Sequence, residues 1–196
     1  MTAFRGGPGP EAYYSTGVAS TALATFTTED NLQKGQPLCK LPDLAQWMHR
    51  LGDETSTAKF RALVQAGAVS ATTPTYTFSL RALTSATWSA GGILLATSTA
   101  CTCASGVTKG LAQIDVDFWL RTAPIPGTST ITTVVGGTVT GSAFTNQCSM
   151  PPAGTDPFIS TLDVTAQYYL FLSVACSASN ASNTITCQGA KLYIEN

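Results

Sequence analysis

The chain has 196 residues and a formal net charge of −1, and only 11% of its residues are charged, against 44% hydrophobic. This length suits one domain with a well-buried core and an additional segment. The sparse lysine and arginine argue against binding to nucleic acid or to a charged membrane surface, and no apolar run is long enough to span a bilayer.

Residues 1–57 are predicted to form an extended N-terminal arm. Glycine and proline fill positions 6–10, where neither supports a regular helix or strand. Aromatic residues along the arm favour packing on a partner, since disordered segments are usually poor in them. The arm residues that we expect to contact that partner are Phe4, Arg5, Tyr13, Tyr14 and Phe26.

One short helix is predicted within the arm, at about residues 41–51. Pro42 and Asp43 suit its start, and Gly52 suits its end. Its apolar residues would lie on one face, which is typical of packing rather than of a ligand site.

From residue 58 to residue 196 the apolar residues recur with a period of two, which predicts an all-β domain. The expected strands are 60–68, 75–83, 93–96, 111–121, 129–140, 159–164, 168–175 and 184–194. About eight short strands with regularly spaced turn signals indicate a β-sandwich or barrel. We find no internal repeat and no second core.

The last two strands are predicted to form a β-hairpin around the polar loop 177–183. Strand 168–175 carries apolar residues on both faces, so we expect both faces to be covered, by a second sheet or by a neighbouring subunit. Strand 184–194 alternates apolar and polar residues, which is typical of a half-solvated strand.

The strand at 111–121 places five polar or aromatic residues on its outward face: Gln113, Asp115, Asp117, Trp119 and Arg121. The two aspartates would stand about 6.5–7 Å apart, a separation that an acid/base pair of a glycosidase could use. We favour a structural role, in which they are solvated or pair with cations across a subunit contact.

No enzymatic activity is predicted, and neither a cofactor nor a metal. His49 is the only histidine and has no nucleophile-elbow motif beside it. Cys101 and Cys103 lack the spacing of a zinc site. The N-terminus has no apolar signal-peptide core, so we expect folding in a cytoplasm, with the six cysteines as free buried thiols.

Four segments, in order, carry a resemblance to a known family: LVQAGAVSATTPTYTFSLRAL, GGILLATS, DVDFWLRT and LDVTAQYYLFLSVACSASNASNTITCQGAKLYIEN. They resemble the TNF-like jelly-roll domain of tailed-bacteriophage virion proteins, of the head-decoration or minor structural type. The resemblance covers residues 58–196 and implies an eight-stranded jelly-roll β-sandwich, commonly a homotrimer, on the outside of the particle.

The function expected from this resemblance is that of a capsid decoration (cement) protein on the outer capsid surface. Its partners would be other copies of itself and the major capsid protein, which the N-terminal arm would clamp. The alternative is a module of the tail or a fibre that binds host-surface glycans. In that case Trp88 or Trp119, together with Asp115, Asp117 and Arg121, would supply the ligand surface.

Overall fold

The computed structural model describes residues 11–16, 19–41, 56–68, 73–120, 130–151 and 158–195. These residues form strands, turns and loops, and none of them is helical. The strands are β1 (Glu11–Thr16), β2 (Asp30–Asn31), β3 (Cys39–Lys40), β4 (Ser56–Gly67), β5 (Thr75–Leu83), β6 (Ile93–Thr97), β7 (Cys101–Thr102), β8 (Gly110–Leu120), β9 (Thr130–Gly141), β10 (Cys148–Met150), β11 (Phe158–Asp163), β12 (Tyr169–Cys176) and β13 (Thr184–Glu195).

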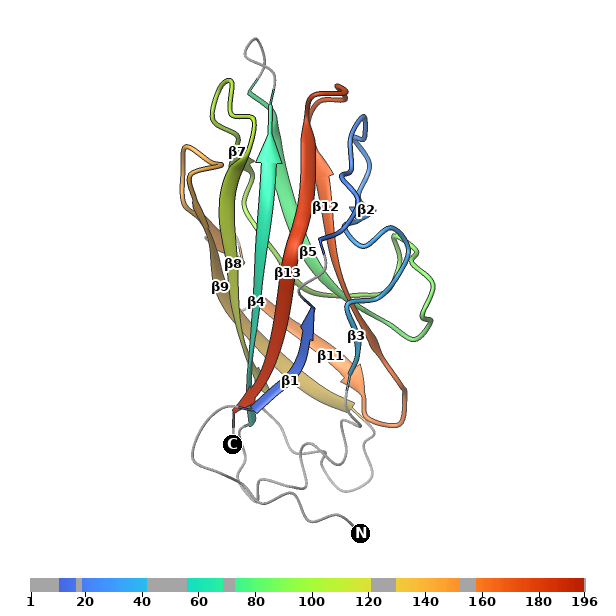
Figure 1. The fold of residues 1–196 in the computed structure, drawn as a ribbon. Helices are drawn as coiled ribbons and strands as arrows, with labels where there is room; N and C mark the ends of the chain where they lie inside the picture. The colour runs from blue at the N-terminus through green and yellow to red at the C-terminus, as the bar shows by residue number, and fades with distance from the viewer. Residues whose placement is uncertain are drawn as a thin grey trace.

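The strands make two antiparallel sheets that face each other (Figure 1). The long sheet has seven strands in the order β1-β13-β4-β8-β9-β10, with β11 paired to β9. The short sheet has six strands in the order β2-β12-β5-β6, with β3 paired to β12 and β7 to β5. The all-β prediction is therefore confirmed, whereas the number of strands in the described ranges is thirteen rather than eight. From β4 onward, eight strands have five residues or more, so the extra ones are short or precede β4.

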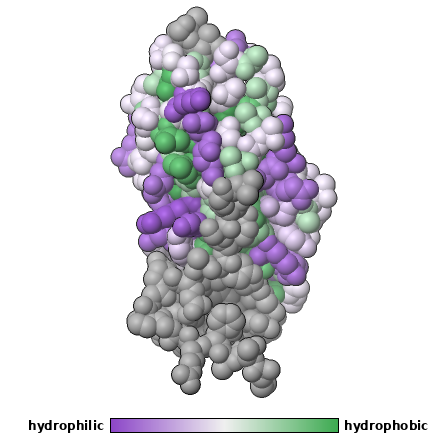
Figure 2. Space-filling view, viewed as in Figure 1, coloured by the Kyte–Doolittle hydropathy of each residue, from purple (hydrophilic) through white to green (hydrophobic). Residues whose placement is uncertain are grey.

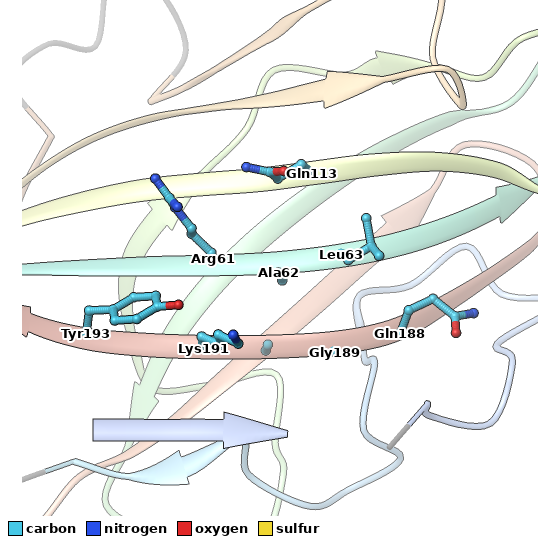
Figure 3. Close-up of a pocket in the computed structure, with 9 residues that line it drawn as sticks. Arg61, Ala62, Leu63, Gln113, Gln188, Gly189, Lys191 and Tyr193 are labelled. Atoms are coloured by element: carbon cyan, nitrogen blue, oxygen red, sulfur yellow. The ribbon is translucent and has the colours of Figure 1, made fainter. Parts of the chain in front are cut away.

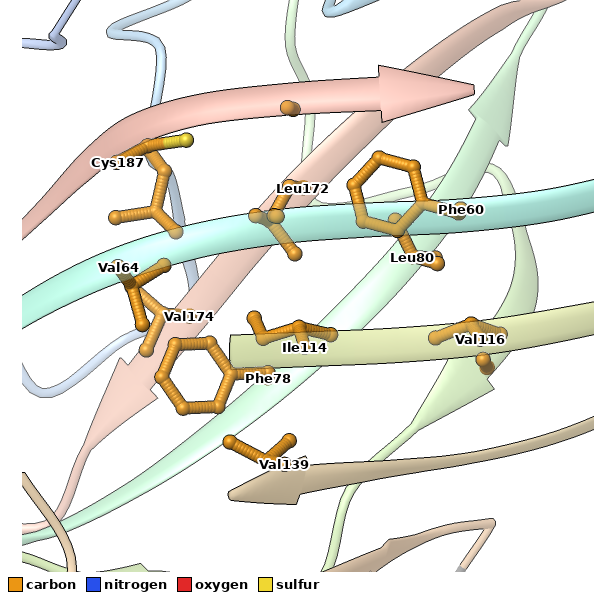
Figure 4. Packing of buried hydrophobic residues seen from close by; sticks show 14 of the residues in the cluster. Phe60, Val64, Phe78, Leu80, Ile114, Val116, Val139, Leu172, Val174 and Cys187 are labelled. Carbon is orange, nitrogen blue, oxygen red and sulfur yellow. The ribbon is translucent and has the colours of Figure 1, made fainter. Parts of the chain in front are cut away.

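The core lies between the sheets and follows the period-two pattern of the sequence. The inward residues of β8, from Ala112 to Phe118, are buried, while the alternate residues face outward. Phe60 and Phe78 come from opposite sheets and pack together with aliphatic residues of β8, β9 and β12 (Figure 4). All six cysteines are free and buried, as predicted.

The C-terminal hairpin prediction is wrong. β12 pairs with β5 in the short sheet, and β13 pairs with β4 in the long sheet, so the loop between them crosses from one sheet to the other. Counting from β4, the first strand thus pairs with the last, β13, and the second strand, β5, pairs with the second to last, β12. The eight-stranded jelly-roll arrangement stays a prediction, because the two sheets hold seven and six strands, and β9, β10 and β11 extend the long sheet beyond β8.

The described part of the predicted arm lies along the sandwich. β1 extends the long sheet, and Leu23 forms an isolated bridge with Ile185 of β13. The chain then turns, and β2 and β3 pair with β12 in the short sheet. Residues 11–16 and 19–41 thus join the two sheets along one side (Figure 1). The predicted helix falls outside the described residues except for Leu41, which is not helical.

The outer face of β12 is covered, as its apolar residues predicted. Phe171 is fully buried although it is not part of the core between the sheets. The Trp88 ring packs on it with a centroid separation of 5.5 Å. Next to it, Arg81 of β5 makes a two-point ion pair with Glu29 from the N-terminal segment, both distances being 2.7 Å. The cover therefore comes from this chain.

Candidate binding surface on the long sheet

The outward face of the long sheet gathers the polar residues predicted from strand 111–121, and strand register aligns them in rows. The rows run across β13, β4, β8 and β9 and are Tyr193–Lys59–Asp117–Gly136, Lys191–Arg61–Asp115–Thr138 and Gly189–Leu63–Gln113–Thr140. The space-filling view from the same side shows hydrophilic and hydrophobic patches next to each other on this face (Figure 2). Leu63 and Leu111 remain about 40% exposed here.

Asp115 and Asp117 lie on this face as predicted, and their ion-pair partners belong to the adjacent strand β4. The Arg61 Nε lies 2.9 Å from the Asp115 Oδ1, and the Lys59 Nζ lies 3.5 Å from the Asp117 Oδ1. Gln113 donates a hydrogen bond of 2.6 Å to the Asp115 Oδ2. Because these side chains are substantially exposed, each ion pair contributes at most about 1 kcal/mol to stability.

Trp119 is 41% exposed on the same face. Its indole ring reaches the space above Gly136, where an added Cβ would lie 3.7 Å from the ring atom Cζ3. Arg121 lies outside the described residues. Trp88 lies away from this surface, in the loop that covers Phe171 on the short sheet. Trp88 and Trp119 are therefore not parts of one ligand surface.

A shallow groove of about 310 Å³ crosses β13, β4 and β8 (Figure 3). Its floor is low where Gly189, which has no side chain, pairs with Leu63 next to an irregularity in the ladder between Cys187 and Gly189. The polar and aromatic side chains around it are Arg61, Gln113, Gln188, Lys191 and Tyr193. Register and this irregularity create the groove, and neither can be read from one strand's pattern.

A second hollow of about 530 Å³ lies between the N-terminal segment and the loop that carries Trp88. Asp30, Lys34 and Thr87 contribute to its lining. Trp88 also serves the fold here by packing on Phe171.

The five arm residues predicted to contact a partner do not form one surface among the residues that the structure describes. Phe4 and Arg5 lie outside the described residues. Tyr13 and Tyr14 belong to β1, whose backbone pairs with β13. Phe26 packs against the core of this chain, with its ring 6.5 Å from that of Tyr76.

Several titratable groups away from the groove have shifted pKa values because they are buried or paired within the fold. Partial burial acts to raise the pKa of Glu29, but hydrogen bonds from Arg81 and Ser173 and the charge of Arg81 hold this pKa below its usual value. Burial raises the pKa of the Cys39 thiol to about 12 and that of Cys103 to about 11. Within the described ranges, no three histidine, cysteine or acidic residues gather as metal ligands, and no helix could cross a membrane.

Comparison with solved structures finds a similarity to a module of a phage protein. The chain matches the structure of the CBM2 module of Lactobacillus casei BL23 phage J-1 evolved Dit at 10% identity and a TM-score of 0.29. The match covers 79% of this chain and 66% of that chain, and a TM-score of this size does not establish a shared fold. No protein-family model and no curated protein matches the sequence.

Proposed function

We propose that this protein is a capsid decoration protein of a tailed bacteriophage, a homotrimeric jelly roll that binds the major capsid protein on the outer surface of the head after folding in the host cytoplasm. The order of sequence segments that resembles phage virion proteins supports this proposal, and so does the two-sheet β fold. The role requires binding area rather than catalysis.

The observation that carries the proposal is the position of the strand ends. Glu11 pairs with Ile194, Thr57 with Glu195, and Ser56 with Leu120, so these residues share one end of the sandwich. Glu11, the first residue that the structure describes, therefore lies at the same end as Glu195. We expect Phe4 and Arg5 to make the capsid contact from this end.

The test is binding to particles that lack the protein. A chain of residues 11–196 keeps all thirteen described strands, so it should melt like the full chain while its binding to the particles falls by at least about tenfold. Undiminished binding of 11–196 would refute attachment through residues 1–10. Light scattering should give three times the monomer mass of 20.3 kDa, and a monomer would remove the trimer from the proposal.

The second candidate function is binding of host-surface glycans. The observation that favours it is the groove, where Tyr193 lies beside the cationic side chains of Lys191 and Arg61 and the amides of Gln113 and Gln188 line the remainder. An aromatic ring with neighbouring planar polar groups suits a sugar, which offers an apolar ring face and hydroxyl groups.

A further inference from the structure

One row of residues through the groove, that of Lys191 and Arg61, places two positive charges side by side. Lys191 of β13 and Arg61 of β4 are directly opposite each other and both face outward. Opposed like charges on neighbouring strands destabilise a sheet. Such a local conflict is expected where a residue is kept for function rather than for stability.

The nearby acidic group does not balance both cations. Asp115 lies on the far side of Arg61, within 2.9 Å of the Arg61 Nε. Lys191 is exposed, and among the side chains that the structure describes no carboxylate lies within ion-pair distance of it. One positive charge at the groove is therefore left for an external anion.

The amides on the two sides of the groove are set to accept hydrogen bonds. The Gln113 Nε2 donates to the Asp115 Oδ2 at 2.6 Å, and the Gln188 Nε2 donates to the Gln65 Oε1 at 3.3 Å. Each of these Nε2 groups keeps a second N–H, and the Oε1 atoms of Gln113 and Gln188 remain as acceptors, so both amides can bond hydroxyl groups, which donate and accept. A simple anion such as phosphate offers mainly acceptors and would leave the two Oε1 atoms without a donor.

We propose that this groove binds an acidic saccharide, with a carboxylate of the sugar between Lys191 and Arg61. The sugar hydroxyls donate to the Gln113 and Gln188 amide oxygens, and the Tyr193 ring lies beside the sugar ring. This site deepens the second candidate function only. It does not depend on attachment of the N-terminal residues to a capsid, which the particle-binding test examines separately.

The experiment is calorimetric titration of the full chain with digalacturonic acid, a disaccharide with two carboxylates. Cellobiose, inorganic phosphate and tetraglutamate serve as the neutral, inorganic and peptide comparisons. Lys191→Gln removes the unpaired cation, and Lys109→Gln is its matched control, because Lys109 is an exposed lysine on the loop before β8. Thermal melts verify that both variants are folded.

We expect the wild-type chain to prefer digalacturonic acid, and Lys191→Gln to weaken this binding by about tenfold, as for a lost charge-assisted hydrogen bond. Lys109→Gln should bind within about twofold of wild type on the same scale. Binding of phosphate as tight as that of the disaccharide, tighter binding of tetraglutamate, an unchanged Lys191→Gln variant or no binding at all would each overturn the proposal.

Discussion

Lys191 and Arg61 stand opposite each other on the open face of the long sheet, so their repulsion should be measurable without any ligand. Lys191→Gln should raise the free energy of unfolding by about 0.3 kcal/mol at low salt, because it removes a directly opposed like charge. Chemical denaturation tests this prediction, with Lys109→Gln as the control that should change nothing. A less stable Lys191→Gln protein would show that Lys191 supports the fold.

Glu29 should make the stability of the fold depend on pH. Its pKa is lowered in the folded chain, so it contributes stability above its unfolded pKa of about 4.3, and this contribution is lost as the pH falls through the folded value. Glu29→Gln should cost about 1–2 kcal/mol at neutral pH, since Arg81 loses a charged partner.

Denaturant titrations from pH 7 to pH 3 test this dependence. The wild-type chain should lose more stability over this interval than Glu29→Gln does, because the variant has already lost the ionised group. Parallel pH profiles of the two proteins would contradict the role assigned to the Glu29–Arg81 pair.

At the scale of elements, the N-terminal segment is a structural part of the sandwich. It supplies five buried hydrophobic residues to the core, namely Leu23, Leu32, Leu38, Cys39 and Leu41. Burial of four leucines contributes roughly 6–12 kcal/mol by side-chain transfer, which is comparable with the whole stability of a typical domain.

A chain of residues 58–196 should therefore fail to melt cooperatively, because it lacks these residues and the strands β1, β2 and β3, which pair with β13 and β12. Circular dichroism in the near ultraviolet, compared between 58–196 and 11–196, measures this difference. A native-like, cooperative melt of 58–196 would show that residues 19–41 add little to the core.

Individual strands were predictable where one face is buried and the other solvated. The β8 strand was predicted at 111–121 and observed at Gly110–Leu120, since its alternation of apolar and polar residues has one consistent interpretation. The C-terminal hairpin was predicted wrongly, because proximity in sequence does not determine sheet membership. That both faces of β12 are covered was predictable, but the packing of Trp88 on Phe171 depends on contacts distant in sequence.

The groove was beyond prediction for a related reason. Lys191 and Tyr193 could be assigned to the solvated side of their strand, yet their position opposite Arg61 and Lys59 depends on the register of β13 against β4. The irregularity between Cys187 and Gly189 shifts that register, and a shift of one residue would move these side chains to the other face.

At the scale of the whole molecule, the strand ends and the groove define two separate regions. Glu11 lies at the end that also holds Glu195, whereas the groove lies on the outward face of the long sheet. A protein attached by this end would leave the face with Lys191 and Tyr193 accessible. Particle attachment and saccharide binding are thus compatible in one molecule.

The most direct test of the central claim is immunogold electron microscopy of intact phage particles, with an antibody raised against the folded chain. We predict label spread over the head, as expected for a decoration protein on the outer capsid surface. Label confined to the tail tip would contradict capsid decoration and favour the glycan-binding candidate, and particles without label would contradict a place in the virion altogether.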